Sequence, residues 1–382
     1  MVGPWKAPPA GAAIVVGGVP IAVKPTLLYL GVVLDSKWNF CAHFERVAPK
    51  LLRAASAFGR ILPNLGGPAA SRRRLYTGVV RSMALYGAPV WANALNRENI
   101  ARLRQPQRTM AVRVIRGYRT ISAEAACVLA CSLPWDLDAR VLASLYQWRG
   151  KVRDRGDVLA PQEIQMRRME LQQEAVDNWR LRLERPSAGV RTIEAIQPVL
   201  REWIERDFGV LTFRLTQVLS GHGCFGKYLH KQARREPTPE CHECGAREDS
   251  AQHTLAECPV WGVEREEVIA RVGQDLSLPA IVQAMLSGEE VWQTMLDYSE
   301  HVMAKKEAAE REREIQVEAD PMRRRRTRRR RAAHDRLATL TSTSGWQTRG
   351  RLSPIGKRSS GWKACQVFRH ALNGGFGQAS AR

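Results

Sequence analysis

The chain has 382 residues, a hydrophobic content of 44% and a formal net charge of +21. This length is enough for two or three domains. The charge favours a polyanionic partner, either nucleic acid or an anionic membrane surface. No apolar run approaches the length of a membrane-spanning helix, which argues against an integral membrane protein.

The strand signals are nearly confined to the first residues. Residues 14–16 and 19–23 are rich in β-branched side chains and flank the pair Gly17-Gly18, so they predict a hairpin. Residues 27–34, LLYLGVVL, predict one further strand. Asp35 and Ser36 follow it and are suitable helix caps.

From Phe40 onward the apolar residues recur every three or four positions, which predicts helices. Pro49 lies inside the first run and is expected to kink or split it. The second helix carries an apolar face formed by Leu75, Val79, Met83 and Tyr86. A third helix follows from Asn96, with Pro106 inside it, and further helices follow from Ser122 and over residues 137–152.

The later part of the chain is also helical by pattern. Long charged helices are expected over 162–183 and 290–318, and shorter ones over 192–207, 211–219, 263–272 and 278–286. We therefore predict a mainly α fold with a small N-terminal β remnant, a helical bundle, a zinc-stapled module and a disordered basic tail. The expected domains are 1–36, a helical domain over 37–152, a helical linker over 153–210, a zinc module over 211–290, a charged helix over 291–320, and a tail over 321–382.

Residues 241–258, here called the metal loop, read CHECGAREDSAQHTLAEC. Their spacing, Cys-x2-Cys-x8-His-x4-Cys, predicts a tetrahedral Zn²⁺ site with Cys241, Cys244, His253 and Cys258 as ligands. The His-x4-Cys half fits a short helix starting near Ser250. Four protein ligands leave no open position for water, so the site is expected to be structural. The alternative is four unrelated polar or core residues.

Basic residues provide the candidate nucleic-acid contacts. On the second helix these are Arg72, Arg73, Arg74 and Arg81, and before the metal loop they are Lys227 and Lys231. Arginine side chains contact phosphates and give salt-sensitive affinity without sequence preference. The alternative reading is an ordinary solvated face.

A block of arginines, residues 323–331 and here called the arginine tract, follows Pro321, where order is expected to end. Its candidates are Arg323, Arg324, Arg325, Arg326, Arg328, Arg329, Arg330 and Arg331. The tract would bind nucleic acid or serve as a nuclear import signal, and a solvated tail without a partner is the alternative. A nuclear location is therefore expected.

No catalytic residues are predicted. The sequence holds no Gly-x-Ser-x-Gly, Walker loop, dinucleotide fingerprint or His-Glu-x-x-His motif. Asp35 follows a strand, as a catalytic carboxylate might, but it has no second carboxylate close by for two-metal chemistry. It reads better as a cap.

Three segments resemble the end of the palm and the thumb of non-LTR retrotransposon reverse transcriptases, most closely the insect R1 type. They are Tyr29-Leu-Gly-Val-Val-Leu-Asp35, Arg74-Leu-Tyr76 and Val79-Val-Arg81-Ser-Met-Ala-Leu-Tyr-Gly-Ala-Pro-Val-Trp91. The metal loop resembles the cysteine-histidine module of the same polyproteins. The resemblance covers roughly residues 12–265.

The resemblance implies RNA-directed DNA polymerase activity in the parental protein, with Mg²⁺ as its cofactor, acting by target-primed reverse transcription. Element RNA and target DNA, in ribosomal RNA genes for the R1 type, are then the partners. The family's Phe/Tyr-Ala-Asp-Asp motif precedes the YLG segment, and nothing in residues 1–28 matches it. We therefore expect a 5′-truncated element or partial gene product that does not polymerise DNA by itself.

Two rival functions remain open at this point. The first is an active polymerase. The second is a host-adopted zinc-binding interaction protein with no nucleic-acid role.

Overall fold

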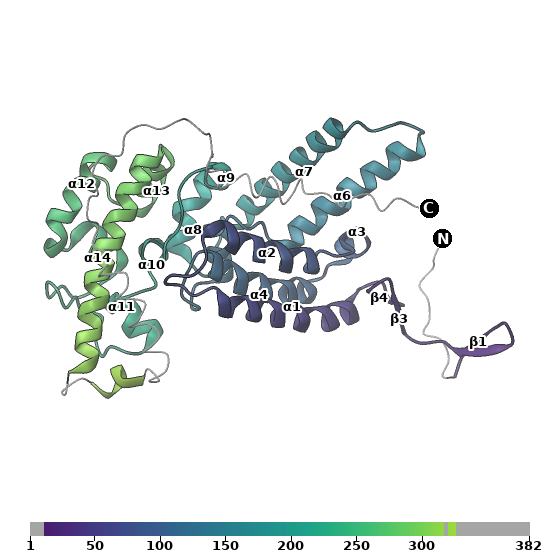
Figure 1. Ribbon diagram of the computed structural model, residues 1–382, viewed down its shortest axis with the longest axis horizontal. Coiled ribbons are helices and arrows are strands. Elements are labelled where there is room, and N and C mark those ends of the chain that lie inside the picture. The colour runs from purple at the N-terminus through teal and green to yellow at the C-terminus, as the bar shows by residue number, and fades with distance from the viewer. Residues whose placement is uncertain (1–10, 317–319, 326–382) are drawn as a thin grey trace, which may run out of the picture. The chain divides into compact units, whose positions relative to one another are not determined.

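The computed structural model describes residues 11–316 and 320–325, with side chains as far as Arg323. The described chain is mainly α-helical, as predicted, with two short antiparallel strand pairs near its start (Figure 1). Among the described residues, none of the helices is both long enough and apolar enough to cross a membrane.

The described residues divide into two compact units that interleave along the chain. The first contains residues 11–59, 76–110 and 132–182, and the second contains 60–75, 111–131 and 183–325. The predicted domains are contiguous stretches, and their boundaries remain predictions.

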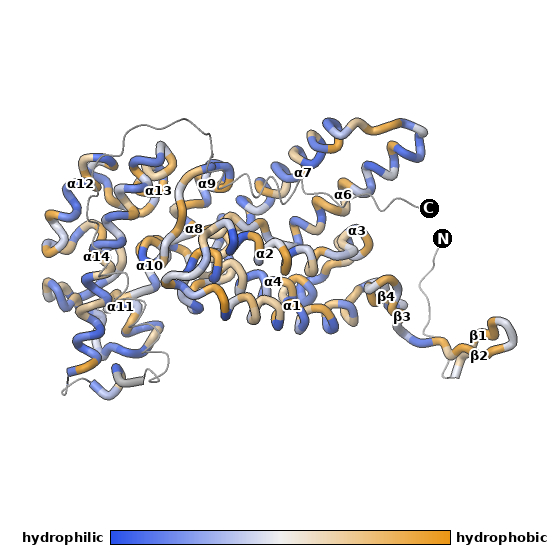
Figure 2. The backbone as a smooth tube through the Cα atoms, in the orientation of Figure 1, coloured by the Kyte–Doolittle hydropathy of each residue, from blue (hydrophilic) through white to orange (hydrophobic). Residues whose placement is uncertain are grey.

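The first strand pair confirms the predicted hairpin. β1 (Ala13–Val16) and β2 (Val19–Ala22) pair across Gly17 and Gly18, whose φ angles of 56° and 81° fit a tight hairpin turn. Figure 2 shows the hydrophobic character of both strands, yet all of their residues are exposed.

The prediction of one strand over 27–34 is wrong. The segment forms two strands, β3 (Thr26–Tyr29) and β4 (Val32–Asp35), that turn back on each other at Leu30 and Gly31. Both turn residues have positive φ, 45° and 84°, and the glycine adopts this conformation at little cost. The LLYLGVVL pattern hides this turn because only one of its residues is a turn former.

Asp35 does not cap the first helix, which begins at Cys41, so the helix-cap prediction for this residue is wrong. Its carboxylate accepts the backbone N–H groups of Lys37, Asn39 and Phe40, the last at 2.7 Å. These bonds fix the turn that leads into α1 (Cys41–Ile61). Phe44 of that helix is fully buried and packs edge-on against Trp91, with ring centroids 5.1 Å apart.

The first helix is not split at Pro49, so that part of the expectation is wrong, while the expected kink there stays a prediction. α1 runs without a break through Pro49, and α4 (Arg97–Val114) likewise runs through Pro106. Pro49 is exposed, and so is Glu45, whose carbonyl loses its helical partner. Water can therefore replace the hydrogen bond that the proline removes.

Helices follow the predicted order through the first unit. They are α2 (Ala70–Ala84), which continues into this unit from the second, α3 (Ala88–Trp91), α6 (Trp135–Asp154) and α7 (Pro161–Arg182). The apolar face predicted for α2 is exposed in the structure, at Leu75, Val79, Met83 and Tyr86. Val80 and Ala84 face the core instead. The spacing of apolar residues therefore predicted the helix correctly but not which of its faces is buried.

The second unit contains the remaining helices. They are α5 (Ala123–Leu129), α8 (Val190–Ile196), α9 (Leu200–Glu205), α10 (Phe213–Ser220), α11 (Gly226–Tyr228), α12 (Gly262–Val272), α13 (Leu278–Leu286) and α14 (Glu289–Ile315). The helix expected over 192–207 is divided into α8 and α9 at a 3₁₀ turn that contains Pro198.

α14 organises the second unit, and it packs against α10, α12 and α13 (Figure 1). Its anchors include Trp292, Met295 and Val302, all buried. Its charged residues are not simply solvated, because Lys306 and Glu310 are each only 1% exposed. Both side chains point to the region around the metal loop, as described below.

Candidate metal centre and basic surface

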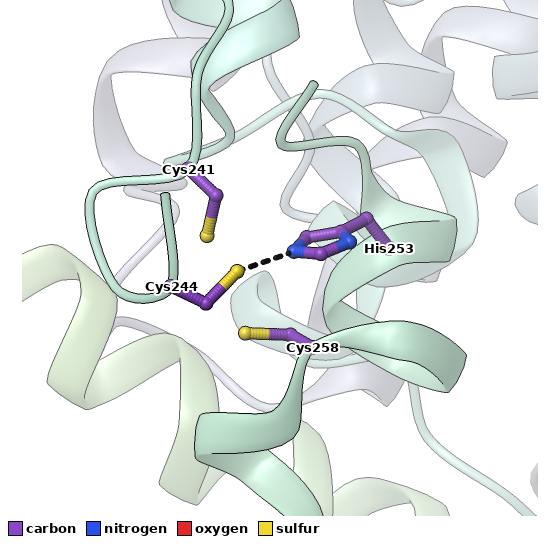
Figure 3. A group of neighbouring side chains, drawn as sticks. All are labelled: Cys241, Cys244, His253 and Cys258. Carbon is purple, nitrogen blue, oxygen red and sulfur yellow. Dashed lines mark hydrogen bonds between the residues drawn. The ribbon is translucent and has the colours of Figure 1, made fainter. Parts of the chain in front are cut away.

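The structure brings the four predicted ligands together. The Sγ atoms of Cys241, Cys244 and Cys258 and a ring nitrogen of His253 all lie within 4.8 Å of one another (Figure 3). Cys241, His253 and Cys258 are buried, and Cys244 is partly exposed. This is the convergence that the Cys-x2-Cys-x8-His-x4-Cys spacing predicts.

The first half of the site is a tight turn. The Gly245 N–H donates to the Cys241 carbonyl at 2.8 Å, and the Cys241 N–H donates to the Ala246 carbonyl at 2.9 Å. Gly245 has a φ of 77°, which favours glycine. The turn directs the thiols of Cys241 and Cys244 to one point.

The second half is a π-helical turn, His253–Glu257, that follows a short helical start at Ser250. The Ser250 hydroxyl accepts the His253 N–H, and the Cys258 N–H donates to the His253 carbonyl at 2.8 Å. This bond spans five residues and places His253 and Cys258 on one side.

The imidazole is oriented for coordination. His253 Nε2 lies 3.2 Å from Cys244 Sγ (Figure 3). Its Nδ1 lies 3.4 Å from the Glu257 carboxylate. A proton held on Nδ1 by this carboxylate leaves the Nε2 lone pair directed toward the three sulfurs.

The donor set fits a zinc ion. Tetrahedral Zn–S bonds of about 2.3 Å place two sulfurs roughly 3.8 Å apart, which agrees with the spread of the four atoms here. Burial raises the pKa of the Cys241 and Cys258 thiols. A divalent cation would stabilise the thiolates that burial disfavours.

Cys244 differs from the other two thiols. Burial raises its pKa, but hydrogen bonds from the Ala246 backbone N–H and from the Cys241 and His253 side chains outweigh this effect and lower it.

A second group of ligand types, Cys241, Glu243 and Asp249, also lies within 4.8 Å. In this group a lysine side chain provides the positive charge that balances the carboxylates. Lys306 Nζ of α14 lies 3.0 Å from Glu243 and 2.9 Å from Asp249, and its side chain is 1% exposed. We therefore assign this group to the support of the metal loop rather than to a second ion.

The same Asp249 ties the preceding segment to the loop. Its carboxylate accepts the Gly226 N–H at 2.8 Å and the Thr254 hydroxyl at 3.1 Å. A Cβ on Gly226 would lie 2.5 Å from the Glu240 carbonyl oxygen, so the two backbones meet at a distance that only glycine permits.

The C-terminal end of the metal loop is held by Arg265 of α12. Its buried guanidinium donates to the carbonyl of Leu255 at 2.8 Å and to that of Cys258 at 2.7 Å. The sequence gives no indication of Arg265 or Lys306, because each acts through a contact that is distant in sequence or hidden among other charges.

The four predicted contact arginines of α2 have different environments. Arg73 is 0% exposed, and its guanidinium donates to the carbonyls of Pro63, Gly66, Pro68 and Arg113. It therefore has a structural role. Its burial does not favour nucleic-acid contact by Arg73, which stays an untested prediction.

Arg81 forms a two-point ion pair with Asp138 of α6, with contacts of 2.5 and 2.7 Å. Arg72 is exposed and Arg74 is half-buried. Nucleic-acid contact by Arg72 and Arg74 remains a prediction, and Arg81 would have to share its charge with Asp138.

A second group of arginines lies at and after the end of α4. Arg113 and Arg116 lie close to Arg73, and Arg119 lies close to Arg113. Burial lowers the pKa of Arg113, and the charge of Arg119 lowers it further. For Arg73 burial is the larger cause and the charges of Arg116 and Arg113 add to it, giving a pKa of about 10. The signal in the sequence is the short RGYR segment, 116–119.

The segment before the metal loop is mainly packed. Phe225 and Tyr228 are buried, and the Tyr228 hydroxyl and His222 Nδ1 both lie 2.8 Å from the Thr120 hydroxyl. Lys227 and Lys231 are exposed but face Glu248, at 2.7 and 3.9 Å. Their contact with nucleic acid remains a prediction.

The arginine tract begins inside the described chain. Pro321–Arg325 forms a 3₁₀ turn, so order does not end at Pro321, and Arg323 is buried. The side chains of Arg324 and Arg325, and all of residues 326–331, lie outside the described residues. The predictions for Arg324, Arg325, Arg326, Arg328, Arg329, Arg330 and Arg331 therefore stay predictions, as does the expected disorder of the tail.

Comparison with known proteins identifies relatives of one kind. A Retrovirus-related Pol polyprotein from type-1 retrotransposable element R1 4 of Nasonia vitripennis is 29% identical over 75% of this chain and 74% of its own length. A Putative 115 kDa protein in type-1 retrotransposable element R1DM of Drosophila melanogaster is 27% identical over 73% of this chain and 28% of its own length.

A Retrovirus-related Pol polyprotein from type-1 retrotransposable element R1 of Bradysia coprophila is 30% identical over 64% of this chain and 25% of its own length. The chain thus spans about a quarter of two of these relatives and about three quarters of the first. No protein-family model and no solved structure matches the chain.

Proposed function

This chain is related to the Pol polyproteins of R1-type non-LTR retrotransposable elements, and from that premise we propose that it binds nucleic acid as the thumb and C-terminal part of a reverse transcriptase. The relationship over about three quarters of the chain is the observation that carries the proposal. Element RNA and target DNA are the proposed partners, in target-primed reverse transcription. We assign no catalytic residue to the described chain.

The charge distribution supports the proposal. The formal net charge is +21. Burial lowers the pKa of Arg73 and Arg113, and the charges of neighbouring arginines lower both further. Phosphate binding near clustered arginines lowers the free energy, because it reduces the repulsion between their charges and releases counterions from the nucleic acid. Arg119 is the exposed member of this group.

The metal loop contributes a fixed surface rather than chemistry. Cys241, Cys244, His253 and Cys258 would hold a Zn²⁺ ion, which supplies folding free energy to the loop. Lys306, Asp249 and Arg265 then connect the loop to α14, α11 and α12. Nucleic acid would bind to a rigid module, with Lys227 and Lys231 on its surface.

The arginine tract would supply further phosphate contacts and direct the protein to the nucleus. A fluorescent fusion in which Arg326 and Arg328–Arg331 are replaced by glutamine tests the second role. Nuclear accumulation should be lost in the variant, and unchanged accumulation would contradict it.

The direct test of nucleic-acid binding is fluorescence anisotropy with a single-stranded RNA and a DNA duplex at several salt concentrations. We expect a linear fall of log affinity against log salt, with a slope that corresponds to several phosphate contacts. Arg119→Gln should reduce the slope by about 1. Arg153→Gln is the control, because Arg153 is exposed on α6, in the other compact unit.

The rival without a nucleic-acid role, a host-adopted zinc-binding interaction protein, predicts no binding of either probe near physiological salt. Affinity that does not change with salt would likewise contradict the proposal. Primer extension by the purified chain with Mg²⁺ would instead support the active-polymerase rival.

A further inference from the structure

Arg323 is the first arginine of the tract, and it is only 7% exposed. Its guanidinium forms ion pairs with Glu236, which precedes the metal loop, and with Glu310 of α14, the latter at 3.3 Å. Both carboxylates are 1% exposed. A charge run that composition alone marks as solvated thus has its first member inside the fold.

Glu236 and Glu310, here called the acidic site, are suited to a guanidinium. Among the described residues, Glu236 Oε2 and Glu310 Oε1 have no hydrogen-bond partner, so both carboxylates keep acceptor capacity beside their contacts with Arg323. Burial raises the pKa of the Glu310 carboxyl, and the charge of Glu236 raises it further. Two buried carboxylates with spare acceptor capacity require a cation that carries several directed donors, which is the chemistry of arginine.

The other side chains around the acidic site are exposed or paired elsewhere. His242 Nε2 lies 3.4 Å from Glu236 Oε1, but His242 is exposed. Arg313 also reaches Glu310, at 3.4 Å, but it is partly exposed. The neighbouring Arg235 is paired with Glu314. Loss of Arg323 would therefore leave Glu236 without its arginine partner and Glu310 only partly paired.

The acidic site lies beside the metal loop. Arg323 Nη2 is 3.2 Å from Nε2 of His242, which stands between the ligands Cys241 and Cys244 in the sequence. Arg235, the residue before Glu236, also donates to the Arg323 carbonyl at 3.4 Å. Arg323 is thus held through both its side chain and its backbone.

We propose that Glu236 and Glu310 form a guanidinium-binding site that anchors Arg323 and so fixes the start of the arginine tract next to the metal loop. Nucleic acid bound by the tract would then be placed against the metal module rather than at a variable distance from it. This consequence rests on the proposed function. The anchoring itself does not, because it is a contact within the chain.

Trypsin cleavage of the zinc-loaded full chain tests the anchor. A buried arginine is cut only after local opening, so the initial rate of cleavage after Arg323 reports that opening. In Glu236→Gln/Glu310→Gln we expect this rate to rise by about tenfold or more, because the charge partners of a buried cation are removed. Mass spectrometry of the first fragments identifies each cut.

Glu312→Gln is the matched control. Glu312 is exposed on the same helix, α14, so its replacement should leave the rate after Arg323 unchanged. Cleavage after the buried Arg265 is the internal control, because it requires the metal module itself to open. An unchanged rate after Arg323 in the double variant would overturn the proposal.

The rate of cleavage after Arg265 could also rise in the double variant. In that case the single variant Glu310→Gln decides whether the anchor exists, because Glu236 is still present to hold Arg323. A selective rise after Arg323 in that variant supports the anchor, and a parallel rise overturns it. The readout needs no nucleic acid, so its failure is distinguishable from failure of RNA or DNA binding.

Discussion

The metal loop and the arginines of α2 carry predictions of two different kinds. The loop is predicted from the spacing of ligand types, and its four ligands converge within 4.8 Å. The α2 contacts are predicted from charge, and of their four arginines one is buried and one is paired with a carboxylate. The ligand spacing correctly predicted which side chains converge, whereas positive charge did not predict which arginines face solvent.

The physical reason is that ligand spacing encodes a local geometry. A Cys-x2-Cys turn and a His-x4-Cys turn each converge within a few residues, and only their meeting requires the rest of the fold. The environment of an arginine is set by residues far away in sequence. Arg73 is buried because the 63–68 loop and the end of α4 present carbonyls to it.

The largest expected effect is a loss of stability when the charge of Lys306, which supports the metal loop, is removed. Lys306→Met leaves Glu243 and Asp249 buried without their cation, and it should destabilise the module by about 3–4 kcal/mol. Hydrogen exchange of α14 amides in the zinc-loaded chain measures this change. A loss below about 1 kcal/mol would mean that Lys306 does not support the loop.

The next effect tests whether the arginines of α2 differ in their contribution to stability. Arg73→Met removes a buried guanidinium from four carbonyls and should cost about 2–3 kcal/mol in the exchange of α2 amides. Arg72→Met, at the exposed neighbour, should change stability by less than about 0.5 kcal/mol. Equal effects of the two substitutions would break the distinction between structural and surface arginines.

A glycine beside the metal loop provides a third test. The Cβ of Gly226→Ala meets backbone atoms at 2.5 and 2.8 Å, so the substitution should cost about 2 kcal/mol through forced displacement. Gly262→Ala is the control, because a Cβ there has nothing within 4 Å. Zinc retention during dialysis against a weak chelator should fall only in the first variant.

The smallest expected effect concerns a surface ion pair. The hydrogen bond from Lys305 lowers the pKa of the Glu264 carboxyl. The stability it adds is present above the carboxyl's unfolded-state pKa and is lost as pH falls through the lower folded value. Lys305→Met should therefore cost at most about 0.5–1 kcal/mol at pH 7. The difference should shrink below about pH 4, and a difference that grows in acid would contradict this account.

Helix positions were largely predictable, because 3.6-residue periodicity is a local property. The helix over 278–286 matches α13, and the long charged helix over 162–183 lies within one residue of α7 at each end. The four ligands of the metal loop were predictable for the same reason, because their spacing is also a local property.

The failures come from long-range packing. The exposed apolar face of α2 and the buried charges of α14 could not be assigned without the neighbouring helices. Leu30 turns at positive φ because Gly31 follows it, and the hydrophobic pattern conceals that turn. Arg323 is buried because Glu236 and Glu310 lie far from it in sequence.

The most direct test of the central claim, that residues 241–258 form a structural zinc site, is the metal content of the purified full chain by inductively coupled plasma mass spectrometry. We predict about one zinc per chain, since four ligands complete the coordination. Cys244→Ser should lose the metal together with the exchange protection of the loop, while Cys224→Ser, a buried cysteine outside the ligand group, should retain it. Full zinc retention in Cys244→Ser, or no zinc in the parent chain, would contradict the claim.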